Sequence, residues 1–181
     1  MKRLLSSFLL ASLFMVVALS AAPRNSLAQQ PARKPLSPTE AVLSQWNDIG
    51  NKLVAMAQDW PEDKYNYRPN DQVRTFAQQL LHVAGDNYSL INRISGKKMG
   101  NQENDPSTET FKSKAQVVEF LKKSVTDGAA VIQQQGDEGL VKRLAPWVGY
   151  IEHMGEHYGQ LVVYYRNNGV VPPDSRPKPK S

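Results

Sequence analysis

Residues 37–60, SPTEAVLSQWNDIGNKLVAMAQDW, contain the pattern on which the fold prediction depends. Ser37 and Glu40 form a capping box around a proline at the first helical position, so we expect a helix to begin at Pro38. Large apolar side chains then recur at steps of three and four residues, as they do on one face of a helix: Leu43, Trp46, Ile49, Leu53, Met56 and Trp60. Pro61 is expected to end this helix.

Three further segments show the same helical spacing. The second runs from the capping box at Thr75 to about Gly96, the third over 114–135, and the fourth from about Pro146 to a left-handed cap at Gly169. The polar stretch from Gly96 to Phe111 is predicted to be a long loop. Because each helix is apolar on one side and must bury that side against the others, the sequence predicts an all-α four-helix bundle in a single domain, with Trp46, Trp60 and Trp147 in its core.

Composition excludes several classes of function. The chain has 181 residues, enough for one domain with a real core, and it has no cysteine, which excludes disulfide frameworks, zinc–cysteine fingers and thiol nucleophiles. The net charge of +5 comes from the two ends, because residues 37–174 carry 14 basic and 17 acidic side chains. A nucleic-acid partner is therefore not expected.

The first residues are typical of a secretory signal. Lys2 and Arg3 precede an apolar stretch, and small residues follow up to Ala28, so we expect a signal peptide over 1–28. An uncleaved membrane anchor is the alternative. We expect a flexible tether over 29–36, the bundle over 37–171 and a disordered tail rich in Pro and Lys over 172–181. This organisation predicts a periplasmic or secreted protein that is not inserted in the membrane once its signal is removed.

Histidine is the candidate metal ligand in this chain. His153 and His157 are four residues apart on the last helix, so both rings can reach one ion, although such a pair is also common on the surface of a bundle. His82, on the second helix, points away from the centre of its apolar stripe, and periodicity alone does not place it in the interior. Residues 153–157 also match H-x-x-E-H, the inverted zinc-protease motif, but the only later acidic residue is Asp174 in the tail, which argues against a protease.

Three segments of the chain form a recognisable set: Tyr67-Arg68-Pro69, then TFAQQLLH at 75–82, then HMGEHYGQLVVYYRNNGVVPP at 153–173. Together they resemble the DinB-like (damage-inducible) family. The last segment is similar to that family's H-x-x-x-H-x-G-Q stretch, which is followed by R-x-x-G-x-x-P-P. Tyr158 departs from the pattern, because many members of the family have arginine there, so the contacts of that arginine are not expected here.

The resemblance implies an up-down-down-up bundle with a divalent metal held by His82, His153 and His157. It also implies that His82 turns inward. Zinc and nickel are the most plausible ions, since imidazole suits both. Three neutral imidazoles leave at least one coordination position open, and relatives of this kind include thiol-dependent transferases, isomerases and amide hydrolases.

The sequence leaves the activity open between three functions. The first is an exported metal-dependent hydrolase or thiol transferase acting on an unknown small molecule. The second is a non-catalytic periplasmic bundle that binds a metal or a small molecule, and the third is a secreted bundle with vestigial histidines. A homodimer is a possible assembly. The candidate acid–base residues are Glu152, Glu156, Tyr150 and Tyr164, although each is also explained by solvation or packing.

Overall fold

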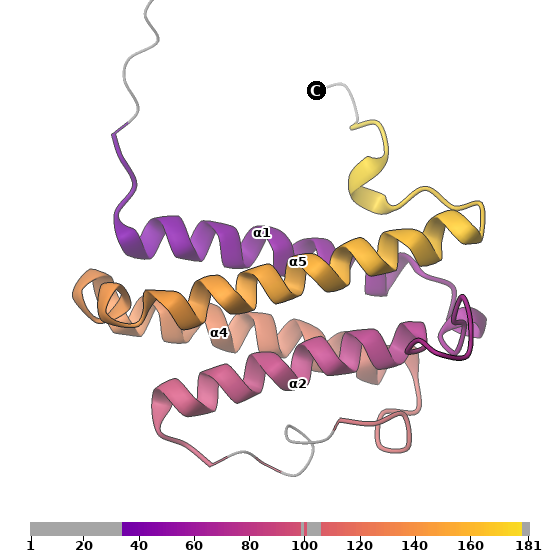
Figure 1. Cartoon of the computed structure of the whole chain (residues 1–181), viewed down its shortest axis with the longest axis horizontal. Helices are drawn as coiled ribbons and strands as arrows, with labels where there is room; N and C mark the ends of the chain where they lie inside the picture. The colour runs from indigo at the N-terminus through magenta and orange to yellow at the C-terminus, as the bar shows by residue number, and fades with distance from the viewer. Residues whose placement is uncertain (1–33, 99, 101–105, 179–181) are drawn as a thin grey trace, which may run out of the picture. The chain divides into compact units, whose positions relative to one another are not determined.

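Four α-helices and two short 3-10 helices account for the regular structure of the described residues, among which there is no strand (Figure 1). The helices are α1 (Pro38–Asp59), η1 (Glu62–Lys64), α2 (Phe76–Ser95), α4 (Lys114–Lys142), α5 (Leu144–Asn167) and η2 (Pro173–Ser175). This computed structural model describes residues 34–98, 100 and 106–178. The predicted signal peptide and most of the predicted tether lie outside the described residues, whereas the predicted all-α bundle is confirmed.

The predicted helix ends agree closely with the structure. Capping boxes begin α1, α2 and α4, and Gly96 and Gly169 adopt the left-handed conformation, with φ values of 68° and 69°. Two boundaries differ. The expected third helix ends at Gln135, where Gly136 (φ 60°, ψ 179°) interrupts the helical geometry, but a further turn continues α4 to Lys142. The last helix begins two residues before Pro146.

The helices have the up-down-down-up order that the resemblance implies. In Figure 1, α2 and α4 run in the same direction and α1 and α5 run in the opposite one. The end of α2 and the start of α4 lie at opposite ends of the bundle, and the connection from Gly96 to Ser113 has enough residues to join two parallel helices. Each of α1 and α2 packs against both α4 and α5. Therefore α2 and α5, which carry the histidines, are antiparallel neighbours.

Aromatic residues fill the core at two levels along α1. Trp46 is fully buried and meets Trp147 edge to face, with ring centroids 5.2 Å apart. Fourteen residues further on, Trp60 stacks on Phe76 at 4.8 Å and contacts Tyr165 at 4.6 Å. These two groups of rings join α1 to α5 and to the start of α2, and they use every tryptophan in the core, as the sequence predicts.

The segment after Pro172 differs from the expected disordered tail in its described part. Residues Pro173–Ser175 form η2, which contacts α1. Arg176 then forms a bidentate ion pair with Asp59, with N–O distances of 2.8 and 2.6 Å, and its guanidinium holds the pKa of Asp59 below its usual value. Composition alone does not predict this ion pair, because the proline and lysine content of a segment does not show that its arginine reaches an acidic side chain on α1.

None of the helices within residues 34–98, 100 and 106–178 combines the length and the apolar character that a membrane span needs.

Gly128 allows α4 to approach α1 closely. A Cβ atom at this position would lie 2.2 Å from Cζ2 of Trp46, whose indole N–H donates to the carbonyl oxygen of Val125 at 2.8 Å. The ring is therefore held by a hydrogen bond and cannot withdraw freely. Gly149 is a useful contrast, because it lies in α5 with no heavy atom near the place of its missing Cβ.

We expect Gly128→Ala to lower the free energy of unfolding by about 1–3 kcal/mol, the usual cost of overpacking a core. Gly149→Ala, the matched control, should raise it by about 0.5–1 kcal/mol, because alanine loses less backbone entropy in a helix. Urea unfolding followed by tryptophan fluorescence measures both. A Gly128→Ala protein as stable as the parent would contradict the close packing of α4 on Trp46.

Candidate metal centre

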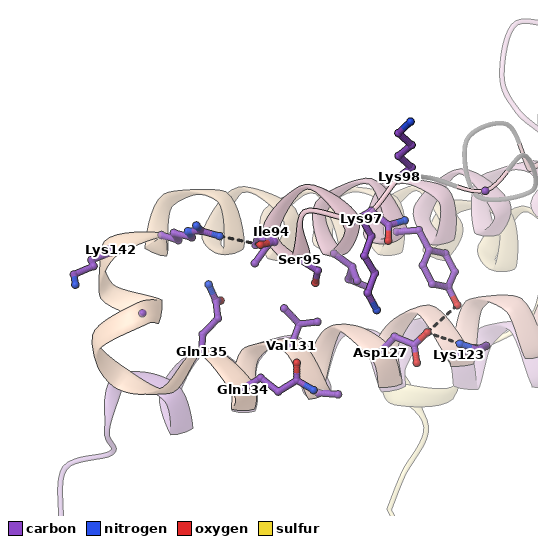
Figure 2. Close-up of a pocket in the computed structure, with 17 residues that line it drawn as sticks. Ile94, Ser95, Lys97, Lys98, Lys123, Asp127, Val131, Gln134, Gln135 and Lys142 are labelled. Atoms are coloured by element: carbon purple, nitrogen blue, oxygen red, sulfur yellow. Dashed lines mark hydrogen bonds and ion pairs between the residues drawn. The ribbon is translucent and has the colours of Figure 1, made fainter.

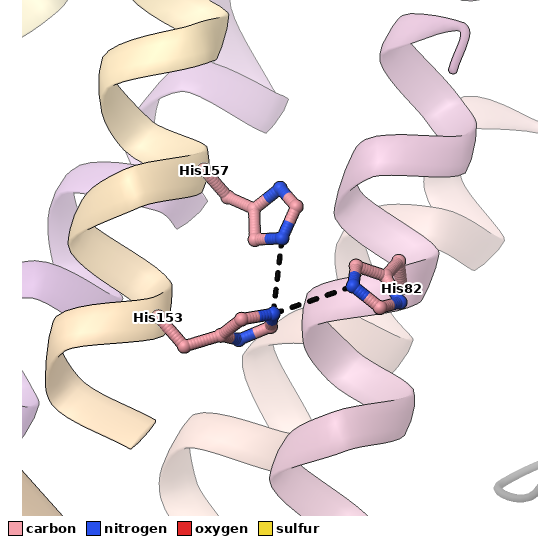
Figure 3. Close-up of side chains that lie close together, drawn as sticks. All are labelled: His82, His153 and His157. Atoms are coloured by element: carbon pink, nitrogen blue, oxygen red, sulfur yellow. Dashed lines mark hydrogen bonds between the residues drawn. The ribbon is translucent and has the colours of Figure 1, made fainter. Parts of the chain in front are cut away.

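The three histidines of the chain meet between α2 and α5. Figure 3 shows the rings of His153 and His157, one turn apart on α5, turned toward the ring of His82 on α2. Nε2 of His153 lies 3.0 Å from Nε2 of His157 and 3.3 Å from Nε2 of His82. Each histidine offers one ring nitrogen, and these three atoms all lie within 4.8 Å of one another.

The arrangement fits the donor set of a transition-metal site. Tetrahedral zinc with bonds of about 2.0–2.1 Å to nitrogen holds its ligand atoms about 3.3 Å apart. The two Nε2–Nε2 distances from His153 are close to that value. Neutral imidazole is a good ligand for zinc and nickel alike. The cluster could therefore hold one divalent ion with only small movements of the side chains.

His82 lies nearer to the interior than its helical wheel indicates. The wheel considers one apolar stripe, but α2 packs against both α4 and α5 and so buries residues over most of its circumference. His82 is at the side facing α5, with 29% of its side chain exposed. The expectation from periodicity alone was wrong for this residue, and the inward position implied by the resemblance agrees with the structure.

A buried glutamine orients His157. Nδ1 of His157 lies 2.6 Å from Oε1 of Gln79, so the ring donates its proton there, and its Nε2 keeps a lone pair that faces the other histidines. The amide of Gln79 in turn donates to Oε1 of Gln160 at 2.9 Å and to the hydroxyl of Tyr164 at 3.3 Å. Tyr164 donates to the carbonyl oxygen of Arg74 at 2.5 Å, which completes the chain of hydrogen bonds.

Asp86 brings a carboxylate to the same place. Its Oδ2 lies 3.2 Å from Nε2 of His153 and 3.5 Å from Nε2 of His82. Neither Asp86 nor Gln79 is among the site residues predicted from the sequence. A usable signal was present for Asp86, because it follows His82 by four residues and so shares its helix face, as His157 does with His153. No local pattern points to Gln79.

Burial favours the neutral form of two of the imidazoles, those of His157 and His82. Loss of water around His157, which is 5% exposed, together with the neighbouring His153 and His82 rings, lowers its pKa from 6.5 to about 4. Burial also lowers the pKa of His82, and the negative charge of Asp86 opposes that shift. Metal binding requires the neutral form, so the fold prepares both rings for it.

The acid–base candidates named from sequence do not join the cluster. Glu152 and Glu156 are exposed, and neither carboxylate lies within 4.0 Å of a described histidine nitrogen, as that of Asp86 does. The ring of Tyr150 is half-buried with its centroid 6.3 Å from that of His153, and the hydroxyl of Tyr164 is already engaged with Arg74. Asp86 is the acidic residue that the structure brings to the histidines.

Hollows open at several places on the described part of the bundle. One of about 490 Å³ is next to the histidine site, since Gln79, the partner of His157, lines it together with Arg74, Gln78 and Gln160. The larger one, of about 1100 Å³, lies between α2 and α4 and has a basic lining (Figure 2). Its cationic residues are Lys97, Lys98, Lys123, Lys142 and Arg143, and no histidine lines either of these two hollows.

The fold and the site together define an all-α bundle with three histidines converging between two of its helices. The family model of the DinB superfamily matches residues 45–164, which is about two thirds of the chain. The chain therefore belongs to the DinB superfamily. No curated protein and no solved structure matches it.

The lowered pKa values predict how stability depends on pH. In the unfolded chain a histidine takes up a proton near pH 6.5, whereas folded His157 does so only near pH 4. The unfolded state therefore binds more protons between these values, and the free energy of unfolding of metal-free protein should fall as the pH is lowered from about 6.5 to about 4. Urea unfolding in the presence of EDTA, repeated over this range, measures the effect.

His157→Gln is the informative variant in this series. Without the titrating ring, the fall in stability over the same pH range should be smaller than in the parent protein. The ion pair of Asp59 with Arg176 adds little to this slope, because the pKa of Asp59 lies below its usual 3.8 and the stability that the pair contributes is lost mainly below this pH range. Equal losses in parent and variant would show that His157 does not have a lowered pKa.

Proposed function

We propose that this protein binds one divalent transition-metal ion, zinc or nickel, through His82, His153 and His157. The observation that supports this most strongly is the convergence of three Nε2-bearing rings from two helices on one point, with separations that suit a metal. The hydrogen bond from His157 to Gln79 adds support, because ligating histidines usually donate their second ring nitrogen to a nearby oxygen.

We further propose that the bound ion serves a hydrolase or thiol-transferase reaction on a small molecule. A divalent ion held by three imidazoles supplies Lewis acidity toward a substrate oxygen or sulfur. The hollow lined by Arg74 and the glutamines offers polar groups beside the site, where a substrate could be oriented. The residues of this chain would then bind and position the substrate, and Gln79 would keep His157 in its orientation.

A non-catalytic metal-binding bundle is the second candidate. This function is favoured because no acid–base candidate is poised for catalysis. The hydroxyl of Tyr164 donates to the carbonyl oxygen of Arg74, and Glu152 and Glu156 are exposed to solvent. A panel of esters, amides and thiol conjugates, tested on zinc- and nickel-loaded protein, separates the two functions. Turnover that is lost in His153→Ala supports the enzyme, whereas tight metal binding with no turnover of any substrate supports the binding protein.

Replacing each histidine in turn tests whether the three rings bind the metal. Purified without chelator, the protein should carry close to one divalent ion per chain, and His82→Ala, His153→Ala and His157→Ala should each bind zinc more weakly. Because His153 and His157 belong to one helix, losing either should cost more than losing His82. Competition with a chromophoric chelator measures the affinities. If all three variants bound zinc as tightly as the parent, this site would be wrong.

Acidification should also weaken zinc binding, because protons compete for the imidazoles. The pKa of about 4 for His157 keeps that ligand available to lower pH than an ordinary histidine. The fold itself should persist without metal, since the aromatic core does not include the three histidines. Far-ultraviolet circular dichroism with and without EDTA is the control for that expectation.

We also propose that the protein is exported and acts in the periplasm or outside the cell, on the basis of the basic, apolar and small-residue order of residues 1–28. Expressed from its native start in a Gram-negative host, it should be recovered from the periplasm with its N-terminus near Gln29. A variant lacking residues 2–28 should stay in the cytoplasm. Soluble cytoplasmic protein that keeps an intact Met1 would contradict export.

A further inference from the structure

Each of α2 and α5 carries a pair of ligand-type residues at positions i and i+4, and the two pairs lie at the interface between these helices. On α5 the pair is His153 and His157, and on α2 it is His82 and Asp86. Residues at this spacing lie one above the other on a helix face. Because α2 and α5 are antiparallel neighbours, Asp86 comes close to His82 and His153. It is not in the group of three ring nitrogens that lie within 4.8 Å of one another, so an ion shared with His157 also requires the carboxylate to move toward that ring.

The carboxylate of Asp86 is close enough to share an ion with the histidines. Its Oδ2 is 3.2 Å from Nε2 of His153, almost the same as the 3.3 Å that separates Nε2 of His153 from Nε2 of His82. The 3.5 Å distance from Oδ2 to Nε2 of His82 is also in the range of two ligands on one metal. These three atoms form a triangle whose sides are all between 3.2 and 3.5 Å.

Asp86 has no cationic partner within the described part of the chain. Its ion-pair contacts there are with His82 and His153, and no described lysine or arginine nitrogen lies within 4.0 Å of its carboxylate. The site therefore presents one negative charge and several lone pairs, an arrangement that a divalent cation would satisfy.

We propose that Asp86 is the fourth protein ligand of the metal, so that the site is His₃Asp. This inference rests on the proposed metal site and extends it. A bound divalent ion would have one of its two charges offset by the carboxylate, which three imidazoles cannot do. Oxygen and nitrogen donors in this ratio are accepted by zinc, nickel and other first-row ions.

The fourth ligand restricts the chemistry that each metal can support. Four protein ligands fill a tetrahedral zinc site, and such closed sites are structural, whereas catalytic zinc sites keep one position for water or substrate. An ion that accepts six ligands retains two positions for a substrate. With Asp86 as a ligand, zinc-loaded protein is expected to be inactive, and an octahedral ion such as nickel is the one expected to support turnover.

Metal affinity of three variants tests the proposal. Asp86→Asn and Asp86→Ala should weaken zinc and nickel binding by about 100-fold or more, because removing a group that only supports the ligands typically costs about 10–100-fold. Glu156→Gln is the matched control, because it removes the same charge from a residue adjacent to His157 but exposed to solvent. Its affinity should stay within about threefold of the parent, since water and salt screen an exposed charge.

A crystal structure of the zinc-loaded protein provides the direct readout. A carboxylate oxygen of Asp86 at about 2.0–2.2 Å from the ion would support the proposal. A water molecule between Asp86 and the ion would overturn it, as would Asp86→Asn binding as tightly as the parent. Circular dichroism of the metal-free variants controls for folding, and 38% exposure of the Asp86 side chain makes both substitutions tolerable.

The two proposals fail in different ways. If the parent protein binds neither zinc nor nickel, the metal site and the role of Asp86 are both overturned. If His153→Ala loses the metal while Asp86→Asn and Asp86→Ala keep the parent's affinity, the three-histidine site stands and only the fourth ligand is overturned.

Discussion

The hydrogen bond from Nδ1 of His157 to Oε1 of Gln79 holds the two histidine-bearing helices in a fixed register at the candidate site. Both groups are buried, so leaving either one without a partner would cost about 1–3 kcal/mol. The bond also decides which ring nitrogen carries the proton, and thereby leaves Nε2 free to bind a cation. Gln79 is itself held by Gln160 and Tyr164, so the orientation of the ligand follows from a chain of contacts between α2 and α5.

The aromatic core provides the frame in which that bond can form. Trp46 and Trp147 meet at one level of the bundle, and Trp60, Phe76 and Tyr165 meet at another. Phe76 begins α2, and Tyr165 is near the end of α5, so this second group sets the separation of the two helices one to two turns from Gln79 and His157. The site is therefore positioned by apolar packing that does not depend on a metal.

Electrostatics at the site favour a cation over protons. Desolvation lowers the pKa values of His157 and His82, so the rings stay neutral and available as ligands. Asp86 places a negative charge against them without a lysine or arginine partner in the described residues. A proton can satisfy one of these groups at a time, whereas a divalent ion can satisfy all of them together. This difference supports the proposed metal site over a set of packed histidines.

The sequence alone determined the helices, because capping boxes, apolar spacing and Gly96 and Gly169 are local signals that act within a few residues. It also determined that His153 and His157 share a face, since one helix carries both. Only the tertiary structure decided that His82 turns toward them, because α2 buries more than one face. Asp86, Gln79 and the anchor from Arg176 to Asp59 depend on contacts between helices or on the end of the chain. Spacing along one segment cannot show which side chains of two separate segments meet, because that depends on how far apart and in which rotation the helices pack.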